Sequence, residues 1–181
     1  MRITGGSLKG RKVQVAAGGL EIRPAMDRMR ESVFAILGDL SGASFLDLFS
    51  GSGVIALEAA SRGAHPVVCV EKDAGKFPLL LKNVAIAEHR IECHSMPVER
   101  FLLRNKTAYS VVFLDPPFPY AFRRELLERL STGPTLEAGG QVLIHFPKED
   151  RLPDFVGRLA LVDAREYGRS IVRFYRSTHE A

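Results

Sequence analysis

The sequence predicts a doubly wound α/β fold, in which a mostly parallel sheet carries helices on both faces. From residue 44 onward, short apolar runs alternate with helix-like segments, which is typical of repeated strand and helix units. The run Val111-Val112-Phe113-Leu114 is apolar at successive positions, and a strand of this kind is buried on both faces. With 181 residues, the chain suits one domain built around one such sheet.

The first 43 residues precede this alternation. In residues 1–20, Val13 and Val15 alternate with polar side chains between glycine-containing turns, so we expect a small hairpin-like extension. A helix is expected from about Asp27, an acceptable N-cap, to Gly38. Its apolar side should hold Met29, Val33, Phe34, Ile36 and Leu37, and its other side Arg28, Arg30 and Glu31.

The remaining elements follow in chain order. We expect strands at 44–49, 66–71, 90–95, 109–115 and 139–146, separated by helices at 53–62, 74–87, 97–104 and 120–131. The tail reads LALVDAREY and SIVRFYR around Gly168-Arg169, which predicts two strands joined by a tight turn. The sheet should therefore have seven strands and close with an antiparallel C-terminal hairpin.

The composition excludes several classes of protein. No apolar run reaches the roughly 18 residues that a membrane span needs, and the N-terminus lacks the apolar middle of a secretory signal. We therefore expect a cytoplasmic protein with no membrane partner. The two cysteines, Cys69 and Cys93, are too few for a zinc site or a disulfide framework, and the histidines show no ligand spacing, so no metal is expected.

The positive charge is concentrated at the N-terminus. Residues 1–30 carry a net charge of +5 and the other residues a net charge of −1, which together give the net charge of +4 for the chain. A basic segment can be simply a solvated face, but it can also bind a polyanion, since Lys and Arg release counterions when they neutralise phosphates. The candidate contacts are Lys9, Arg11, Lys12, Arg23, Arg28 and Arg30.

The stretch SFLDLFSGSGVIALEAASRGA predicts a ligand-binding turn between the first strand of the sheet and its helix. Gly51 and Gly53 permit unusual dihedrals and close approach of a ligand. The turn also matches the dinucleotide fingerprint GxGxxG/A, with Glu71 placed 20 residues after Gly51, so a nicotinamide enzyme stays an alternative.

An acid inside the first strand favours S-adenosylmethionine over a dinucleotide. Asp47 precedes Gly51 by four residues, and an ionised carboxylate is costly to bury without partners. A cofactor with an ammonium and a sulfonium supplies such partners, whereas a pyrophosphate would be repelled; the plainer alternative is that Asp47 caps a backbone group. Glu71 should accept from the ribose hydroxyls, unless it only pairs with Lys72. The expected cofactor contacts in this part are Asp47, Phe49, Ser50, Gly51, Ser52, Gly53, Glu71 and Lys72.

The fourth strand ends in Asp115-Pro116-Pro117-Phe118, a candidate catalytic motif. The two prolines end the strand and stiffen the turn. Asp115 and the Pro116 carbonyl could each accept one N–H of an exocyclic amine and so orient its lone pair toward a methyl donor, while Phe118 stacks on the base. The alternative is a proline-rich turn with a capping acid. Asp115 is also expected to contact the cofactor.

These residues resemble those of class I S-adenosylmethionine-dependent methyltransferases, and more narrowly of the ribosomal RNA small subunit methyltransferase D family. The resemblance spans nearly the whole chain. It is carried by RITGGSLKGRKVQV, RPAMDRMRESVFAIL, LDLFSGSGVIALEAASRGA, VEKD and FLDPPF. The two N-terminal pieces carry the narrower assignment, because the glycine turn and DPPF occur in many amino-methyltransferases.

The resemblance implies a Rossmann-like fold with a basic RNA-contacting extension at residues 1–25 and a methyltransferase domain at 26–181. It implies transfer of a methyl group to N2 of the guanine at position 966 of 16S rRNA, within the 30S subunit or an assembly intermediate. We expect a monomer. The rival activities are methylation of adenine N6 in DNA or of a protein amide, and a different class is an rRNA-binding assembly factor without catalysis.

Four positions depart from the family pattern. Ala25-Met26 replaces polar residues, and Phe118 replaces a tyrosine. HFPKED follows the fifth strand in place of an early acid. The acid that often contacts adenine after the third strand is absent, so that contact is expected from the segment Met96, Pro97 and Val98.

Overall fold

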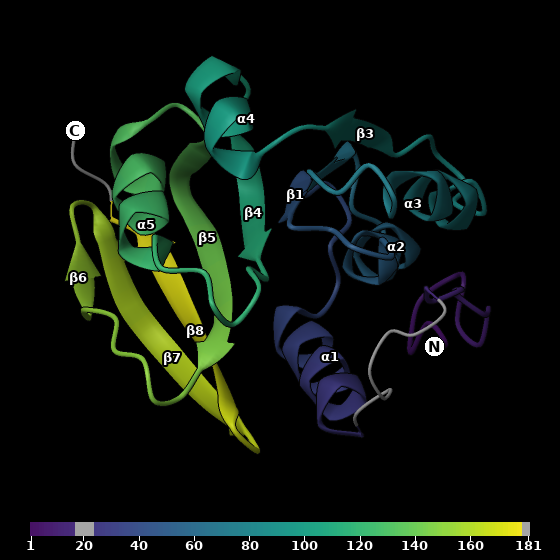
Figure 1. Ribbon diagram of the computed structural model, residues 1–181, viewed down its shortest axis with the longest axis horizontal. Helices are drawn as coiled ribbons and strands as arrows, with labels where there is room; N and C mark the ends of the chain where they lie inside the picture. Colours follow the sequence, from purple (N-terminus) through teal and green to yellow (C-terminus); the bar gives the residue numbers. More distant parts are fainter. Residues whose placement is uncertain (17–23, 179–181) are drawn as a thin grey trace.

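The computed structural model describes residues 1–16 and 24–178, and it contains one eight-stranded sheet with helices on both faces (Figure 1). The strand order is β3-β2-β1-β4-β5-β8-β7-β6. The strands are β1 (Phe45–Leu48), β2 (Val67–Glu71), β3 (Glu92–Ser95), β4 (Tyr109–Leu114), β5 (Leu136–Pro147), β6 (Phe155–Val156), β7 (Leu159–Tyr167) and β8 (Ser170–Ser177). The helices are α1 (Pro24–Leu37), α2 (Val54–Ser61), α3 (Phe77–Val84), α4 (Val98–Arg104) and α5 (Arg123–Thr132).

The predicted fold class is confirmed. Strands β1 to β5 pair in parallel. Strand β8 pairs antiparallel with β5 on one side, and on the other side it pairs antiparallel with β7, its partner in the C-terminal hairpin. The predicted number of strands was too low by one, because β6 pairs with β7 at the edge of the sheet. A two-residue strand is too short to show an alternating pattern, so its sequence gave no signal.

Two apolar clusters lie on the two faces of the sheet. Helices α1, α2 and α3 pack on one face and α4 and α5 on the other, and the central strands β1 and β4 contribute side chains to both clusters. Every residue of β1 and β2 is buried, which agrees with the continuous apolar runs of the sequence. The carboxyl ends of the parallel strands therefore meet at one edge, between the two helical layers.

Helix α1 differs from its predicted form at its start and on one face. It begins at Pro24 rather than near Asp27, and proline is tolerated in the first helical turn because its missing N–H has no partner to lose there. Its end at Gly38 is confirmed, with φ +70°. Ile36, expected on the apolar side, is 43% exposed.

Residues 1–16 form a hairpin-like segment held against the main body of the fold, while residues 17–23 of the extension expected at 1–25 lie outside the described residues. The amide of Ile3 donates to the Arg11 carbonyl at 3.0 Å, and the amide of Gly10 donates to the Ile3 carbonyl at 2.8 Å. Ile3 and Val13 are buried in the cluster with α1 and α2, whereas Val15 is exposed. The apolar side of this segment is therefore part of the core.

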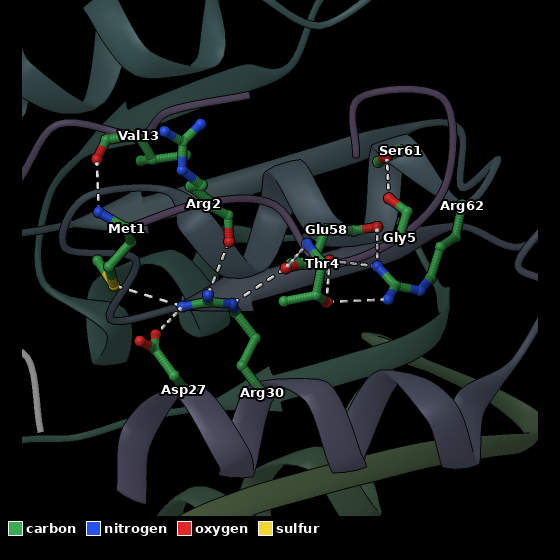
Figure 2. A network of polar contacts seen from close by, with 10 residues as sticks. All are labelled: Met1, Arg2, Thr4, Gly5, Val13, Asp27, Arg30, Glu58, Ser61 and Arg62. Atoms are coloured by element: carbon green, nitrogen blue, oxygen red, sulfur yellow. Dashed lines mark hydrogen bonds and ion pairs between the residues drawn. The ribbon is translucent and has the colours of Figure 1, made fainter. Parts of the chain in front are cut away.

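A buried carboxylate on α2 ties this segment to two helices (Figure 2). Glu58, fully buried, accepts from the backbone amide of Thr4 at 2.8 Å and from Arg30 Nε at 3.0 Å, and it also pairs with Arg62. Arg30 Nη2 donates to the carbonyl of Arg2 at 2.8 Å. Because a buried charge is costly unless it is paired and hydrogen-bonded, this network fixes where residues 1–4 lie.

Among the helices of the described residues, none has both the length and the apolar character that crossing a lipid bilayer requires.

Candidate active site at the carboxyl edge of the sheet

The loops after β1, β2, β3 and β4 meet at one edge of the sheet. The amide of Ser50 donates to the Val70 carbonyl at 3.0 Å, which joins the turn after β1 to the end of β2. The amide of Met96 donates to the Glu71 carbonyl at 3.1 Å, and the amide of Asp115 donates to the Leu48 carbonyl at 3.3 Å. The sequence-predicted residues on these four loops are thereby brought together.

The glycine turn has left-handed backbone at three positions. Phe49, Gly51 and Gly53 have φ of 63°, 53° and 80°. Phe49 is the non-glycine residue with positive φ among those described, and such strain is concentrated at functional turns. Ser50 stabilises the turn, since its hydroxyl donates to the Asp47 carbonyl at 2.8 Å and accepts from the Val70 amide at 3.0 Å.

The two glycines are required for different reasons. A Cβ at Gly51 would meet no atom within 4 Å, so this backbone faces open space where a ligand can approach. A Cβ at Gly53 would lie 2.6 Å from Leu80 and 2.9 Å from Val84, so this backbone packs closely on α3. Gly51 serves the site, and Gly53 serves the packing beneath it.

Alanine at these two positions should separate the two roles. Gly53→Ala combines backbone strain with overpacking and should lower the free energy of unfolding by at least about 2 kcal/mol. Gly51→Ala carries the strain alone and should cost less stability, but it should weaken binding of S-adenosylmethionine. Urea unfolding and calorimetric titration measure the two effects. A larger loss of stability for Gly51→Ala than for Gly53→Ala would contradict these roles.

Asp47 is a buried carboxyl without a full set of partners. It is 1% exposed, and its Oδ2 has no hydrogen-bond partner within the described parts of the chain. Burial, followed by the negative charges of Asp115 and Glu71, raises its pKa well above the ordinary value for an aspartate. A cationic ligand group at this position would supply the missing partner.

Glu71 lies at the end of β2 and faces the glycine turn. Its two carboxylate oxygens accept from the amides of Gly51 and Asp73, each at 2.8 Å. Each oxygen keeps a second acceptor position. Lys72 is exposed, as are Pro97 and part of Met96, while Val98 is buried at the start of α4. The Met96 loop thus lies next to Glu71, in the position where the sequence predicts contact with the adenine.

The candidate catalytic motif reaches the same space as the glycine turn through Asp115. A cavity of about 170 Å³ is lined by Asp47, Gly51 and Asp115, together with Met26 and Met29 of α1. The Asp115 side chain is 27% exposed. Pro116 is buried and Pro117 exposed, and the Phe118 ring is 43% exposed. Asp115 therefore borders the same cavity as the open glycine backbone, whereas the Phe118 ring lines a different pocket.

A buried arginine, for which we made no prediction from the sequence, holds the loop that follows the motif. Arg123 donates to the carbonyls of Pro117 at 3.0 Å, Phe118 at 2.7 Å and Tyr120 at 2.6 Å, and it pairs with Asp150 at 2.7 Å. Arg123 is 5% exposed, although it begins a strongly charged helix. The sequence did not distinguish Arg123 from Arg124 and the other charged residues of α5, which are exposed.

A second residue missed by sequence reasoning is His145 in β5. Its side chain is fully buried, and its Nδ1 lies 2.8 Å from Asp115 Oδ1. A polar residue between Ile144 and Phe146 in a buried strand was the available signal.

The basic residues predicted to bind a polyanion fall into three groups. Lys9, Arg11, Lys12 and Arg28 are exposed, so they are available to a partner. Arg23 lies outside the described residues. The prediction for Arg30 is wrong, because its side chain is 4% exposed and pairs with Glu58 and Asp27. Helical spacing placed Arg30 near the solvated face, but the buried acid of α2 draws it inward.

The N-terminal segment is also linked to the glycine turn. Asn83 of α3 accepts from the Gln14 amide at 3.0 Å and donates to the carbonyls of Gln14 and Ser52, each at 2.8 Å. One buried amide thus joins the end of the exposed basic segment to the turn.

The residues at this edge fit a sulfonium nucleoside. The buried Oδ2 of Asp47 has no hydrogen-bond partner in the described residues, so a cationic group of a ligand would complete its contacts. Gly51 leaves open space for such a ligand. Glu71 keeps acceptor positions on the neighbouring strand end. The buried carboxyl of Asp47 beside the turn would repel a pyrophosphate, which weakens the dinucleotide alternative.

Comparison with known proteins places the chain in a family. The model of the family described as conserved hypothetical protein 95 matches residues 1–176. Ribosomal RNA small subunit methyltransferase D of Escherichia coli strain K12 is 31% identical over 179 residues, which cover 97% of this chain and 89% of the relative. A candidate rRNA methyltransferase of Bacillus subtilis, YlbH, is 32% identical over 183 residues, covering 97% and 98%.

A solved structure agrees with this placement. That of the candidate methyltransferase yhhF from Escherichia coli superposes with a TM-score of 0.89 at 30% identity and covers 99% of both chains.

Proposed function

The chain belongs to the ribosomal RNA small subunit methyltransferase D family, and on that premise we propose that it methylates a guanine of 16S rRNA at the exocyclic N2 amine, using S-adenosylmethionine. The substrate we propose is the guanine at position 966, presented by the 30S subunit or an assembly intermediate to a monomeric enzyme. The observation that carries the proposal is the single cavity shared by Asp47, Gly51 and Asp115.

The cofactor would be held by the strand ends already described. Asp47 would pair with its positive charge, Glu71 would accept from the ribose hydroxyls, and the loop at Met96 would border the adenine. When bound, S-adenosylmethionine supplies an electrophilic methyl group on a sulfonium.

The substrate amine would be oriented by the motif after β4. The lone pair of an exocyclic amine is delocalised into the base, so the amine is a poor nucleophile. Asp115 and the Pro116 carbonyl would accept its two N–H groups, which turns the lone pair out of the base plane and stabilises the positive charge that develops on nitrogen. Deprotonation can follow methyl transfer, so no strong base is required. Phe118 would stack on the base, a contact worth about 1 to 3 kcal/mol.

The loop geometry supports these roles. Arg123 occupies the carbonyls of Pro117, Phe118 and Tyr120, whereas the carbonyl of Pro116 receives no hydrogen bond from the described residues. The stiff turn and its arginine thus leave one acceptor of the motif for the substrate. An acceptor held in place before substrate arrives costs little reorganisation during the reaction.

The exposed lysine and arginine side chains of residues 1–28 would contact RNA phosphates. Reversing the charges of Arg11, Lys12 and Arg28 should weaken RNA binding and lower the salt dependence of binding by about one unit of slope for each lost phosphate contact. A matched control reverses Arg104, Lys106 and Arg129, which are also exposed but belong to the α4 and α5 side. If the salt dependence of RNA binding has the same slope in the two triple variants, the N-terminal lysine and arginine side chains only face solvent and do not contact RNA.

The substrate class is tested by offering labelled S-adenosylmethionine with four acceptors. These are 30S particles, naked 16S rRNA, DNA and a protein extract. We expect label in 30S particles and, after mass-spectrometric mapping, on N2 of one guanine. Label on DNA or protein would replace the proposed substrate, and binding to 30S particles without label transfer would favour a non-catalytic assembly factor.

A further inference from the structure

We propose that His145 is the positioning residue of the active site, where it fixes the Asp115 carboxylate and leaves Asp115 Oδ2 for the substrate amine. The inference rests on the proposed function, since it assigns to Asp115 the contact with that amine. The side chain begins the segment HFPKED, for which the sequence predicts no role.

The parallel pairing of β4 and β5 puts the two side chains together. Leu114 is the register partner of Ile144, so Asp115 and His145 are the next pair along the two strands. Their approach therefore depends on the sheet and not on a flexible loop. The resulting contact joins His145 Nδ1 to Asp115 Oδ1 at 2.8 Å.

Burial fixes the imidazole further. The side chain of His145 is 0% exposed, and the ring of Phe118 packs against it edge-on with 5.8 Å between ring centroids. One buried side chain thus touches both Asp115 and Phe118, the two side chains that we place on the substrate. A rotation of this ring would displace both.

The hydrogen-bond inventory gives the direction of the contact. An ionised carboxylate only accepts, so Nδ1 carries the hydrogen and donates it to Oδ1. The opposite nitrogen, Nε2, has no partner in the described residues and is buried. A buried nitrogen without a partner costs stability, so folding alone does not account for a histidine here.

The charged groups around the pair are both acidic and basic. Arg123 of α5 interacts with the charge of Asp115, and Arg30 of α1 lines the same cavity as Asp115. Asp47 of β1 lies beyond Asp115 and lines the same cavity, and its pKa is raised in part by the charge of Asp115. On the other neighbouring strand, the register partner of His145 is Val172. The contact between His145 and Asp115 is therefore the one specific polar contact that the described residues make with this imidazole.

Two substitutions separate positioning from packing. His145→Leu removes the donor but keeps an apolar side chain of similar size, and it also removes the unpartnered Nε2. We expect turnover to fall by about 10 to 100-fold while the melting temperature stays equal or rises and the dissociation constant for S-adenosylmethionine changes less than about three-fold. His145→Asn places an amide N–H near the former Nδ1, so it should recover most of the turnover lost in the leucine variant.

A spectroscopic measurement tests the contact without turnover. In the free protein, nitrogen-15 NMR should show the His145 ring with its hydrogen on Nδ1, identified by the signal lost in His145→Asn, and Asp115→Asn should shift that signal. Finding the hydrogen on Nε2 would overturn the inference, as would equal turnover in the leucine variant and the wild type, or equal losses in the leucine and asparagine variants. If wild-type protein methylates no acceptor, the proposed function fails, and the NMR result still decides whether His145 holds Asp115.

Discussion

Replacing Asp115 with alanine is expected to lower methyl transfer by at least about 100-fold, because the variant loses the carboxylate that orients the amine and stabilises its developing charge. The carboxylate lies at the boundary between the cavity and solvent, where substrate would approach. Turnover with saturating cofactor and 30S particles measures the loss.

Cofactor affinity distinguishes a chemical role of Asp115 from a general disturbance of the cavity. The dissociation constant for S-adenosylmethionine should stay within a few fold of the wild-type value, since Asp47 and Glu71 carry the proposed cofactor contacts. Glu149→Ala, an exposed acid beyond the end of β5, serves as a control and should leave both quantities unchanged. Normal turnover in Asp115→Ala would remove the proposed role.

Replacing Asp47 with asparagine is expected to weaken binding of S-adenosylmethionine and to raise the stability of the folded protein. The variant loses the charge that would pair with the cofactor, and a charge-assisted hydrogen bond is worth about 1.5 to 3 kcal/mol, so affinity for S-adenosylmethionine should fall by at least about ten-fold. The melting temperature should move the other way, because the wild-type protein buries this carboxyl without a full set of partners.

The stability gain has a defined pH dependence. Burial and the charge of Asp115 raise the pKa of Asp47, so the folded protein binds this proton more tightly than the unfolded chain does. That preference is fully present below the ordinary aspartate pKa and is lost as the pH rises through the raised pKa. Asp47→Asn should therefore match the wild type in acid and gain in melting temperature toward alkaline pH, by about 2 to 4 °C for each kcal/mol.

An exposed aspartate provides the control of opposite sign. Hydrogen bonds from Ser41 lower the pKa of Asp39, so its contribution is present above the ordinary pKa and is lost in acid. Asp39→Asn should not raise the melting temperature at any pH. A pH-independent gain for Asp47→Asn would mean that Asp47 has the same pKa in the folded and unfolded protein, which would contradict the raised pKa.

The parallel part of the fold followed from local patterns. Continuous apolar runs are characteristic of strands covered on both faces, and Gly38, Gly51 and Gly53 were identified because the left-handed backbone at these turns favours glycine. The C-terminal hairpin also followed from the tight turn at Gly168-Arg169, and the meeting of the strand ends at one edge followed from the parallel direction of the strands. The proposed cofactor and amine contacts lie on one edge for the same reason.

The sequence by itself determined which loops form the candidate site, and the tertiary structure decided which charged and polar side chains are buried in it. Arg30 and Arg123 each lie in a segment whose local pattern does not distinguish a solvated side chain from a buried one, and the buried strand around His145 does not show which partner its ring meets. Their partners, Glu58, Asp150 and Asp115, are 27 to 30 residues away along the chain. A charge is stable in the interior only when its partner is there too, and that pairing is set by packing between distant elements.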